Sequence, residues 1–310
     1  MNKPAILEID NLKKTYASGF IPKKKEVIRG VSLSVRDSEI VGFLGPNGAG
    51  KTTIMKIIVG LVTPDAGSVT IMGSDYRDCR VRRHIGYLPE NPVFYEYLSG
   101  EEFLWLAGGL SGMKKEQVRS RAEYLLDMTG LSQAGDLRVR KYSKGMLERL
   151  GMAQALMHDP DFLLLDEPMS GLDPIGRYHM RDLIMKQKEK GKSVFFSTHI
   201  LADVEMICDR IVILVNGRVR STGVLSELLS EEISSHEITC SVEGEPPGGE
   251  GVRILARDGN RLLVETSTEE VLTEFLEALR ARGGKLLSLA PKKKTLEELF
   301  MEEVANGGTP

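Results

Sequence analysis

The glycine-rich segment GPNGAGKTT, residues 45–53, constrains this chain more than any other feature of its sequence. It matches the pattern G-x-x-x-x-G-K-[ST]. The short apolar run EIVGFLG leads into it, and KTTIMKIIVGL continues with apolar residues at helical spacing. Strand, loop and helix in this order predict a phosphate-binding loop, because glycines let backbone N–H groups turn inward and the helix N-terminus is electropositive. An incidental glycine-rich turn would not account for this placement.

Two side chains of this loop have predicted contacts of their own. We expect Lys51 to reach the β and γ phosphates of a nucleotide, and Thr52 to offer its hydroxyl to Mg²⁺. The expected cofactors are therefore ATP and Mg²⁺. The other residues expected to bind the nucleotide here are Gly45, Pro46, Asn47, Gly48, Ala49, Gly50 and Thr53.

A pair of adjacent acids forms the second motif. FLLLDEP places Asp166 at the end of an apolar strand, where ligands bind in open α/β sheets. We expect Asp166 to hold Mg²⁺ through its water shell, and Glu167, pointing the other way, to polarise an attacking water. The alternative is a helix cap before Pro168, which is the weaker explanation beside a phosphate loop.

The rest of the chain predicts an α/β fold, with a P-loop NTPase parallel-sheet core, antiparallel β elements and a helical insert. SVFFSTH and IVILV are further buried-strand candidates, and Asn216-Gly217 predicts a hairpin turn after the latter. Strand patterns vanish between about residues 96 and 159, where helical patterns take over. From about residue 231 a small α+β module is indicated. The predicted domains are therefore 1–230 and 231–310, and a length of 310 residues suits two domains.

Composition narrows the class of protein. A formal net charge of −3 supplies no global basic field, so no nucleic acid is expected as a partner. No apolar run approaches the roughly 18 residues that span a bilayer, so the chain is not expected to cross a membrane. The start lacks the pattern of a signal peptide, and three scattered cysteines suit a reducing cytosol.

Residues 141–174, KYSKGMLERLGMAQALMHDPDFLLLDEPMSGLDP, resemble the nucleotide-binding domain of ATP-binding-cassette proteins. They carry that family's signature segment, Walker B strand and D-loop in succession, and His199 in FFSTHI stands at its switch-histidine position. The resemblance covers about residues 5–230. The variants YSKGM, GYLPE and LEELF are most similar to the ATPase subunits of bacterial export systems with separately encoded membrane subunits.

In that family two such domains sandwich two ATP molecules. The resemblance implies that Ser143 and Gly145 bind the γ-phosphate of the partner's ATP, and that Asp173 bridges the subunits. Helix caps are the alternative for Ser143 and Asp173, and for Asp173 both can be true. Tyr142, Lys144 and Met146 replace the family's common Leu, Gly and Gln, so a Gln-mediated contact is not assumed.

The resemblance also implies roles for three residues outside these motifs. Tyr16 would stack on adenine, with strand packing as the alternative. Glu90, at the position of the Q-loop glutamine, would serve Mg²⁺ or its water, with a solvated loop acid as the alternative. His199 would hydrogen-bond the γ-phosphate, with a core histidine as the alternative.

The resemblance therefore implies a catalytic set of Lys51, Glu167 and His199 in a transport ATPase. It would form a homodimer around two ATP on the cytoplasmic side of the membrane and drive a separately encoded permease. The aromatic segment PVFYEYL, residues 92–98, would face that permease, or else pack inside the insert. A soluble cassette ATPase acting on nucleic acid or ribosomes is the alternative function. A phosphotransferase would leave the signature and D-loop unexplained.

Overall fold

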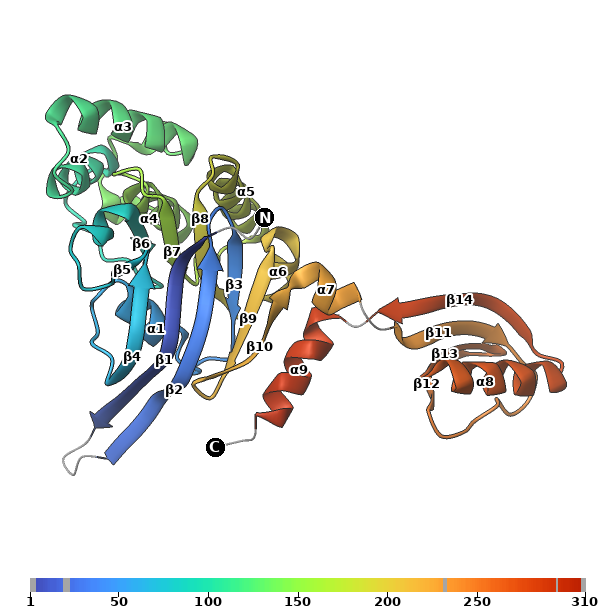
Figure 1. Cartoon of the computed structure of the whole chain (residues 1–310). Coiled ribbons are helices and arrows are strands. Elements are labelled where there is room, and N and C mark those ends of the chain that lie inside the picture. The colour runs from blue at the N-terminus through green and yellow to red at the C-terminus, as the bar shows by residue number, and fades with distance from the viewer. Residues whose placement is uncertain (1–3, 19–22, 231–232, 294, 308–310) are drawn as a thin grey trace. The chain divides into compact units, whose positions relative to one another are not determined.

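The computed structural model describes residues 4–18, 23–230, 233–293 and 295–307, and the chain divides into two compact units (Figure 1). The first unit comprises residues 1–225 and 302–310, and the second comprises residues 226–301. The predicted boundary at residue 231 lies on residues outside the described part. The predicted assignment of residues 302–310 to the C-terminal module differs from this division. The carbonyl of Gly307 accepts hydrogen bonds from Asn216 and Arg220, which belong to the first unit.

A six-stranded sheet with the order β10-β9-β3-β8-β7-β6 forms the centre of the first unit. Its neighbours pair in parallel except for β9 and β10, which the predicted turn at Asn216 and Gly217 joins as a hairpin. Strands β3, β7 and β8 are buried along their whole length, as parallel strands covered on both faces must be. The strands are β3 (Ile40–Leu44), β6 (Ile85–Leu88), β7 (Phe162–Asp166), β8 (Ser193–Thr198), β9 (Arg210–Val215) and β10 (Arg218–Val224).

An antiparallel sheet with the order β2-β1-β4-β5 is the second layer. Its strands are β1 (Ala5–Ser18), β2 (Lys23–Arg36), β4 (Ala66–Ile71) and β5 (Ser74–Asp75). Helix α1 (Lys51–Ile58) buries Ile54, Met55, Ile57 and Ile58 in one hydrophobic cluster with residues of both sheets. The sequence predicts antiparallel elements but does not locate these four strands.

Helices occupy the predicted insert. They are α2 (Gly100–Leu110), α3 (Lys115–Met128) and α4 (Lys144–Ala155), with short 3₁₀ turns at Ser132–Ala134 and Val139–Lys141. Ser99 begins α2 with a capping box to Glu102, which satisfies two terminal N–H groups. Another 3₁₀ turn, Val81–His84, precedes β6. After β7 come α5 (Pro174–Glu189), α6 (Leu201–Ile207) and α7 (Leu225–Ser230).

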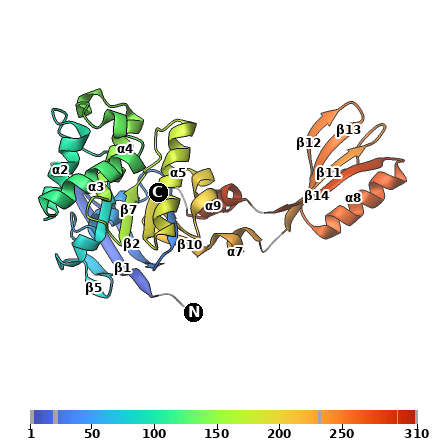
Figure 2. The same ribbon diagram turned by 90° about the horizontal axis from the view of Figure 1, so that it is seen from above.

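The second unit is an antiparallel sheet with the order β12-β13-β11-β14 and one helix against it. Figure 2 shows α8 (Glu269–Ala281) along one face of that sheet. Phe275 and Leu279 of α8 pack on Ile238, Cys240 and Val264 in a separate core. The strands are β11 (Ile233–Ser241), β12 (Val252–Asp258), β13 (Arg261–Thr266) and β14 (Lys285–Lys293), and α9 (Leu296–Asn306) follows them.

Within the described ranges, no helix combines the length and the apolar character that crossing a bilayer requires.

Candidate functional site

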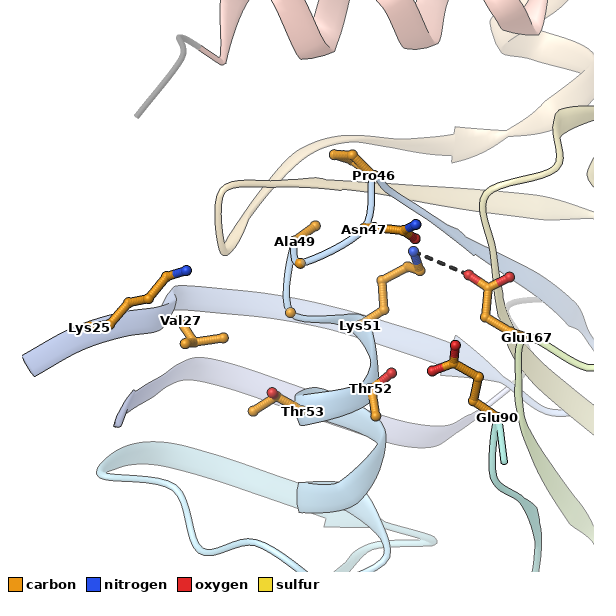
Figure 3. Close-up of a pocket in the computed structure, with 12 residues that line it drawn as sticks. Lys25, Val27, Pro46, Asn47, Ala49, Lys51, Thr52, Thr53, Glu90 and Glu167 are labelled. Carbon is orange, nitrogen blue, oxygen red and sulfur yellow. Dashed lines mark ion pairs between the residues drawn. The ribbon is translucent and has the colours of Figure 1, made fainter. Parts of the chain in front are cut away.

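A cavity of about 380 Å³ opens over the phosphate loop (Figure 3). Every predicted loop residue except Gly45 lines it, and Glu90 and Glu167 face it from the ends of β6 and β7. Lys25 and Val27 of β2 complete the lining. The cavity is of the size that small-molecule sites commonly have.

Glycines shape the loop itself. Gly50 has φ of +113°, a conformation that residues with a side chain rarely adopt. A Cβ on Gly45 would collide with the carbonyl oxygen of Leu214, so the loop can leave β3 only with glycine here. The loop is also held from outside, because the Gly217 N–H donates to the Ala49 oxygen at 3.0 Å.

Lys51 begins α1 and is buried beneath this loop. Its ammonium donates to the Gly45 oxygen at 2.6 Å and lies 3.3 Å from Oε1 of Glu167. The dashed line in Figure 3 marks this ion pair. Lys51 and the catalytic carboxylate candidate therefore meet at the phosphate loop, although they are 116 positions apart in the chain (167 minus 51).

Glu167 follows the last residue of β7 and is only 6% exposed. Its φ of +52° is unusual for a residue with a side chain. The Glu167 N–H donates to Oγ of Ser197 on β8 at 2.9 Å, which helps to hold this conformation. Oε2 lies 2.9 Å from Nδ1 of His199. Both carboxylate oxygens thus have charged or polar partners, in the manner of an oriented general base.

Asp166 has a different environment. Oδ1 accepts a hydrogen bond from the Ser197 hydroxyl at 2.6 Å, but the buried Oδ2 has no hydrogen-bond partner. Burial raises the pKa of Asp166, and the hydrogen bond from Ser197 opposes that rise, as does the Thr52 hydroxyl. A buried carboxylate oxygen without a partner beside a threonine hydroxyl suits a Mg²⁺ site.

No group of three or more His, Cys, Asp or Glu side chains in the described part of the chain could hold a metal ion by itself. The predicted donor set of Thr52, Glu90 and Asp166 contains only two such side chains. Mg²⁺ in nucleotide sites is held by one or two protein oxygens together with waters and phosphate oxygens.

Of two further residues predicted to bind the nucleotide or its metal, Glu90 lies at the cavity and Tyr16 does not line it. Glu90 lines the cavity, and Figure 3 shows its carboxylate on the same side as Thr52 and Glu167. Tyr16 is not among the lining residues. It pairs in register with Lys25, which is one of them, and its ring is 40% exposed beneath the Lys14 ammonium.

Ser143, Gly145 and Asp173 do not line this cavity. Ser143 caps α4, where its hydroxyl accepts from the Met146 N–H, and Asp173 caps α5 by accepting from the Gly176 N–H at 2.7 Å. The helix caps considered for both residues are therefore present. Gly145 lies beside Leu172 of the predicted D-loop, so the signature and D-loop segments are neighbours within one chain.

Sequence patterns missed three residues of this site. Ser197 joins Asp166 to the backbone of Glu167, and Lys25 and Val27 line the cavity. Ser197 lies in the predicted strand SVFFSTH, where a serine among apolar residues was the available signal. No motif marks Lys25 or Val27, because only the register of β2 brings them to the loop.

Helix α4 also carries an acid that the motifs do not explain. Glu148 is only 5% exposed, and burial raises its pKa to about 7, while Lys144 opposes the rise. An acid with a raised folded-state pKa destabilises the protein once it must ionise. Stability should therefore fall as the pH rises from about 4.5 to about 7 and stay low above that range.

We expect Glu148→Gln to raise the free energy of unfolding at pH 8 by on the order of 1–2 kcal/mol, allowing for solvent screening. The gain should disappear at about pH 3.5, below both pKa values, where the wild-type carboxyl is largely protonated in both states. Thermal unfolding at both pH values measures it. Glu123→Gln, at an exposed site on α3, is the matched control. An equal gain at both pH values would contradict the assignment.

Known proteins are similar to this chain in sequence and in fold. The family profile described as ABC transporter matches residues 28–170. An ABC transporter ATP-binding protein of Nostoc sp. is 42% identical over 99% of this chain and 92% of its own length. The Nod factor export ATP-binding protein I of Rhizobium sp. is 32% identical over 97% of each chain.

A solved structure extends the similarity to three dimensions. It is a dimeric ATP-binding cassette in a post-hydrolysis state, bound to ADP and Pi. It is 28% identical, covers 71% of this chain and 98% of its own, and superposes with a TM-score of 0.65. With close relatives matched over nearly their whole length and a phosphate loop facing Glu167, the chain belongs to the ABC transporter family as an ATP-binding ATPase subunit.

Proposed function

We propose that this ATPase works as a homodimer that closes around two ATP and drives a separately encoded membrane permease in export. The main support for ATP hydrolysis at this site is the contact of Glu167 with both Lys51 and His199 at the phosphate loop. The first unit is the proposed nucleotide-binding domain, and the second is an accessory domain.

Each side chain of the site has a proposed role. Lys51 binds the β and γ phosphates, which compete with Glu167 for its ammonium. Released from that ion pair, Glu167 accepts a proton from the attacking water. His199, 44% exposed at its side chain, holds the other carboxylate oxygen and bonds the γ-phosphate. The remaining loop residues other than Pro46, which has no N–H, surround the phosphates with backbone N–H groups.

Thr52, Asp166 and Glu90 are the proposed residues for Mg²⁺. The unpartnered Oδ2 of Asp166 and the nearby Thr52 hydroxyl support this assignment. When held by these residues, Mg²⁺ would neutralise charge that develops during phosphoryl transfer. The Ser197 hydroxyl donates to Asp166, which favours the ionised form of the carboxyl against the effect of burial.

The proposed dimer contacts involve residues that do not line the cavity of their own chain. Ser143 and Gly145 lie at the exposed start of α4, where backbone N–H groups can meet an anion. In the proposed dimer these groups contact the γ-phosphate of the partner's ATP, and Asp173 lies near the partner's Glu167. The solved relative described above is itself dimeric. Tyr16 is the proposed support for adenine.

The aromatic segment at residues 92–98 is the proposed contact with the permease. Phe94 packs edge-on against Phe103 of α2, with centroids 5.0 Å apart, so this side chain belongs to the insert core. Tyr95 and Tyr97 are 52% and 68% exposed, which suits a partner surface. Their contact would hold the subunit peripherally on the cytoplasmic face of the membrane.

Export is proposed because the Rhizobium relative is named for Nod factor export and is similar along the whole chain. Action on nucleic acid or ribosomes is the competing function, and the net charge of −3 does not favour it.

Glu167→Gln should leave ATP binding intact and lower turnover by roughly 10²- to 10⁴-fold. The substitution removes a positioned base, while the side chain keeps nearly the same size and shape. Phosphate release and titration with a fluorescent ATP analogue measure the two effects. Glu189→Gln at the end of α5 is a matched control. Wild-type turnover in the Glu167 variant would contradict the proposed role.

Ser143→Arg should abolish hydrolysis while a single chain still binds ATP, because the serine is proposed to serve the partner's nucleotide. Mixing it with Lys51→Ala should restore part of the activity, since one composite site then has both motifs intact. Loss of ATP binding by the Ser143 variant as a monomer would rule out the cross-dimer arrangement.

Tyr95→Glu should reduce membrane association with the permease at least about tenfold, because an interface core excludes an unpaired charge. ATPase activity of the purified variant should stay near wild type, as the phosphate loop and β7 are untouched. Leu61→Glu, at a site that is 68% exposed, is the control. Fractionation of cells expressing both subunits measures association. Copurification of the wild type with ribosomes, away from membranes, would favour the competing function.

A further inference from the structure

The hairpin turn between β9 and β10 supports the phosphate loop from outside. Gly217 is buried, with φ of +74°, and its N–H donates to the Ala49 oxygen at 3.0 Å. Its own oxygen accepts from the Arg29 N–H at 2.8 Å. A Cβ on Gly217 would collide with the Val27 oxygen. The turn is therefore fitted closely between the phosphate loop and β2.

A second segment, distant in sequence, holds the other side of this turn. The Gly307 oxygen, just after α9, lies 3.3 Å from Nδ2 of Asn216 and 3.4 Å from a guanidinium nitrogen of Arg220. Gly307 also lies directly on Val215, because an added Cβ would come within 2.6 Å of its Cγ1 atom. With any larger residue at position 307, either the hairpin or the backbone at 307 must move.

These contacts form one continuous chain of interactions. It runs from Gly307 through Asn216 to Gly217, and from there to Ala49 of the phosphate loop. The contacts lie within the first unit, although residues 226–301 of the second unit intervene in the sequence. A loop that binds phosphate through its backbone depends on how firmly that backbone is oriented.

We infer that Gly307 is a positioning residue for ATP binding, which orients the phosphate loop through the Asn216–Gly217 turn. The residue acts through the turn and touches no substrate. Helix α9 begins in the second unit and ends in the first, so a displacement of α9 changes the affinity of the nucleotide site. The inference extends the established ATP-binding activity and does not depend on the proposed dimer or permease.

Two truncations of the full chain that differ by one residue test it. A chain ending at Gly307 keeps an oxygen that can accept from Asn216 and Arg220, whereas a chain ending at Asn306 lacks it. We expect the shorter chain to raise the KM for ATP roughly 3- to 10-fold, the net effect of one or two hydrogen bonds. The kcat should stay within about twofold, because β7 and β8 hold Asp166 and Glu167.

Gly307→Leu should raise the KM similarly, by wedging against Val215. Gly249→Leu is its matched control, since a Cβ there meets nothing within 4 Å. Hydrogen exchange supplies a readout that general destabilisation would not reproduce. The Gly217 amide should exchange faster in the Asn306 truncation and in Gly307→Leu, with the core strand β8 unchanged.

A raised KM together with faster exchange at Gly217, in both affected variants and in neither control, supports the inference. An unchanged KM, unchanged exchange at Gly217, or an equal effect in the chain ending at Gly307 would overturn it. Measurement of ATP binding by the wild type in the same assay separates failure of this inference from failure of nucleotide binding itself.

Discussion

A buried ion pair between Lys51 and Glu167 is the contact on which the site depends. Both side chains are only 6% exposed, and such pairs commonly contribute little net stability because two charges lose their hydration. Here the pair is one part of a network that includes the Gly45 oxygen and His199. Lys51 offers a positive charge to a phosphate, and Glu167 offers a carboxylate to a water. The arrangement is therefore best explained by function, and the surrounding apolar strands supply the stability.

The parallel sheet makes this contact possible. Strands β3, β7 and β8 end at the same edge, so the phosphate loop, the acid pair and His199 follow their carboxyl ends together. Ser197 at that edge bonds both Asp166 and the backbone of Glu167. A shift of β8 by one residue would turn Ser197 away from both and leave a buried carboxylate without its donor.

Much of the fold could be predicted because its signals are local. The strand patterns at β3, β7, β8 and β9, the hairpin at Asn216 and Gly217, and the helices of the insert lie where the sequence places them. Strands β1 and β2 were not located from the sequence. Their long hairpin carries many charged residues and several register shifts, which obscure a simple alternation of apolar and polar positions. Lys25 and Val27 of the cavity escaped prediction for the same reason.

The sequence identifies the motifs on which the proposed chemistry depends. The loop at residues 45–53, the acids at 166 and 167 and the signature segment are contiguous motifs, so their identity does not depend on long-range contacts. Only the tertiary structure decided which oxygens of Asp166 and Glu167 have partners, that Phe94 is packed while Tyr95 is exposed, and that residue 307 returns to the hairpin behind the phosphate loop. These features depend on burial and on pairing between segments distant in the chain, which no local pattern of side chains encodes.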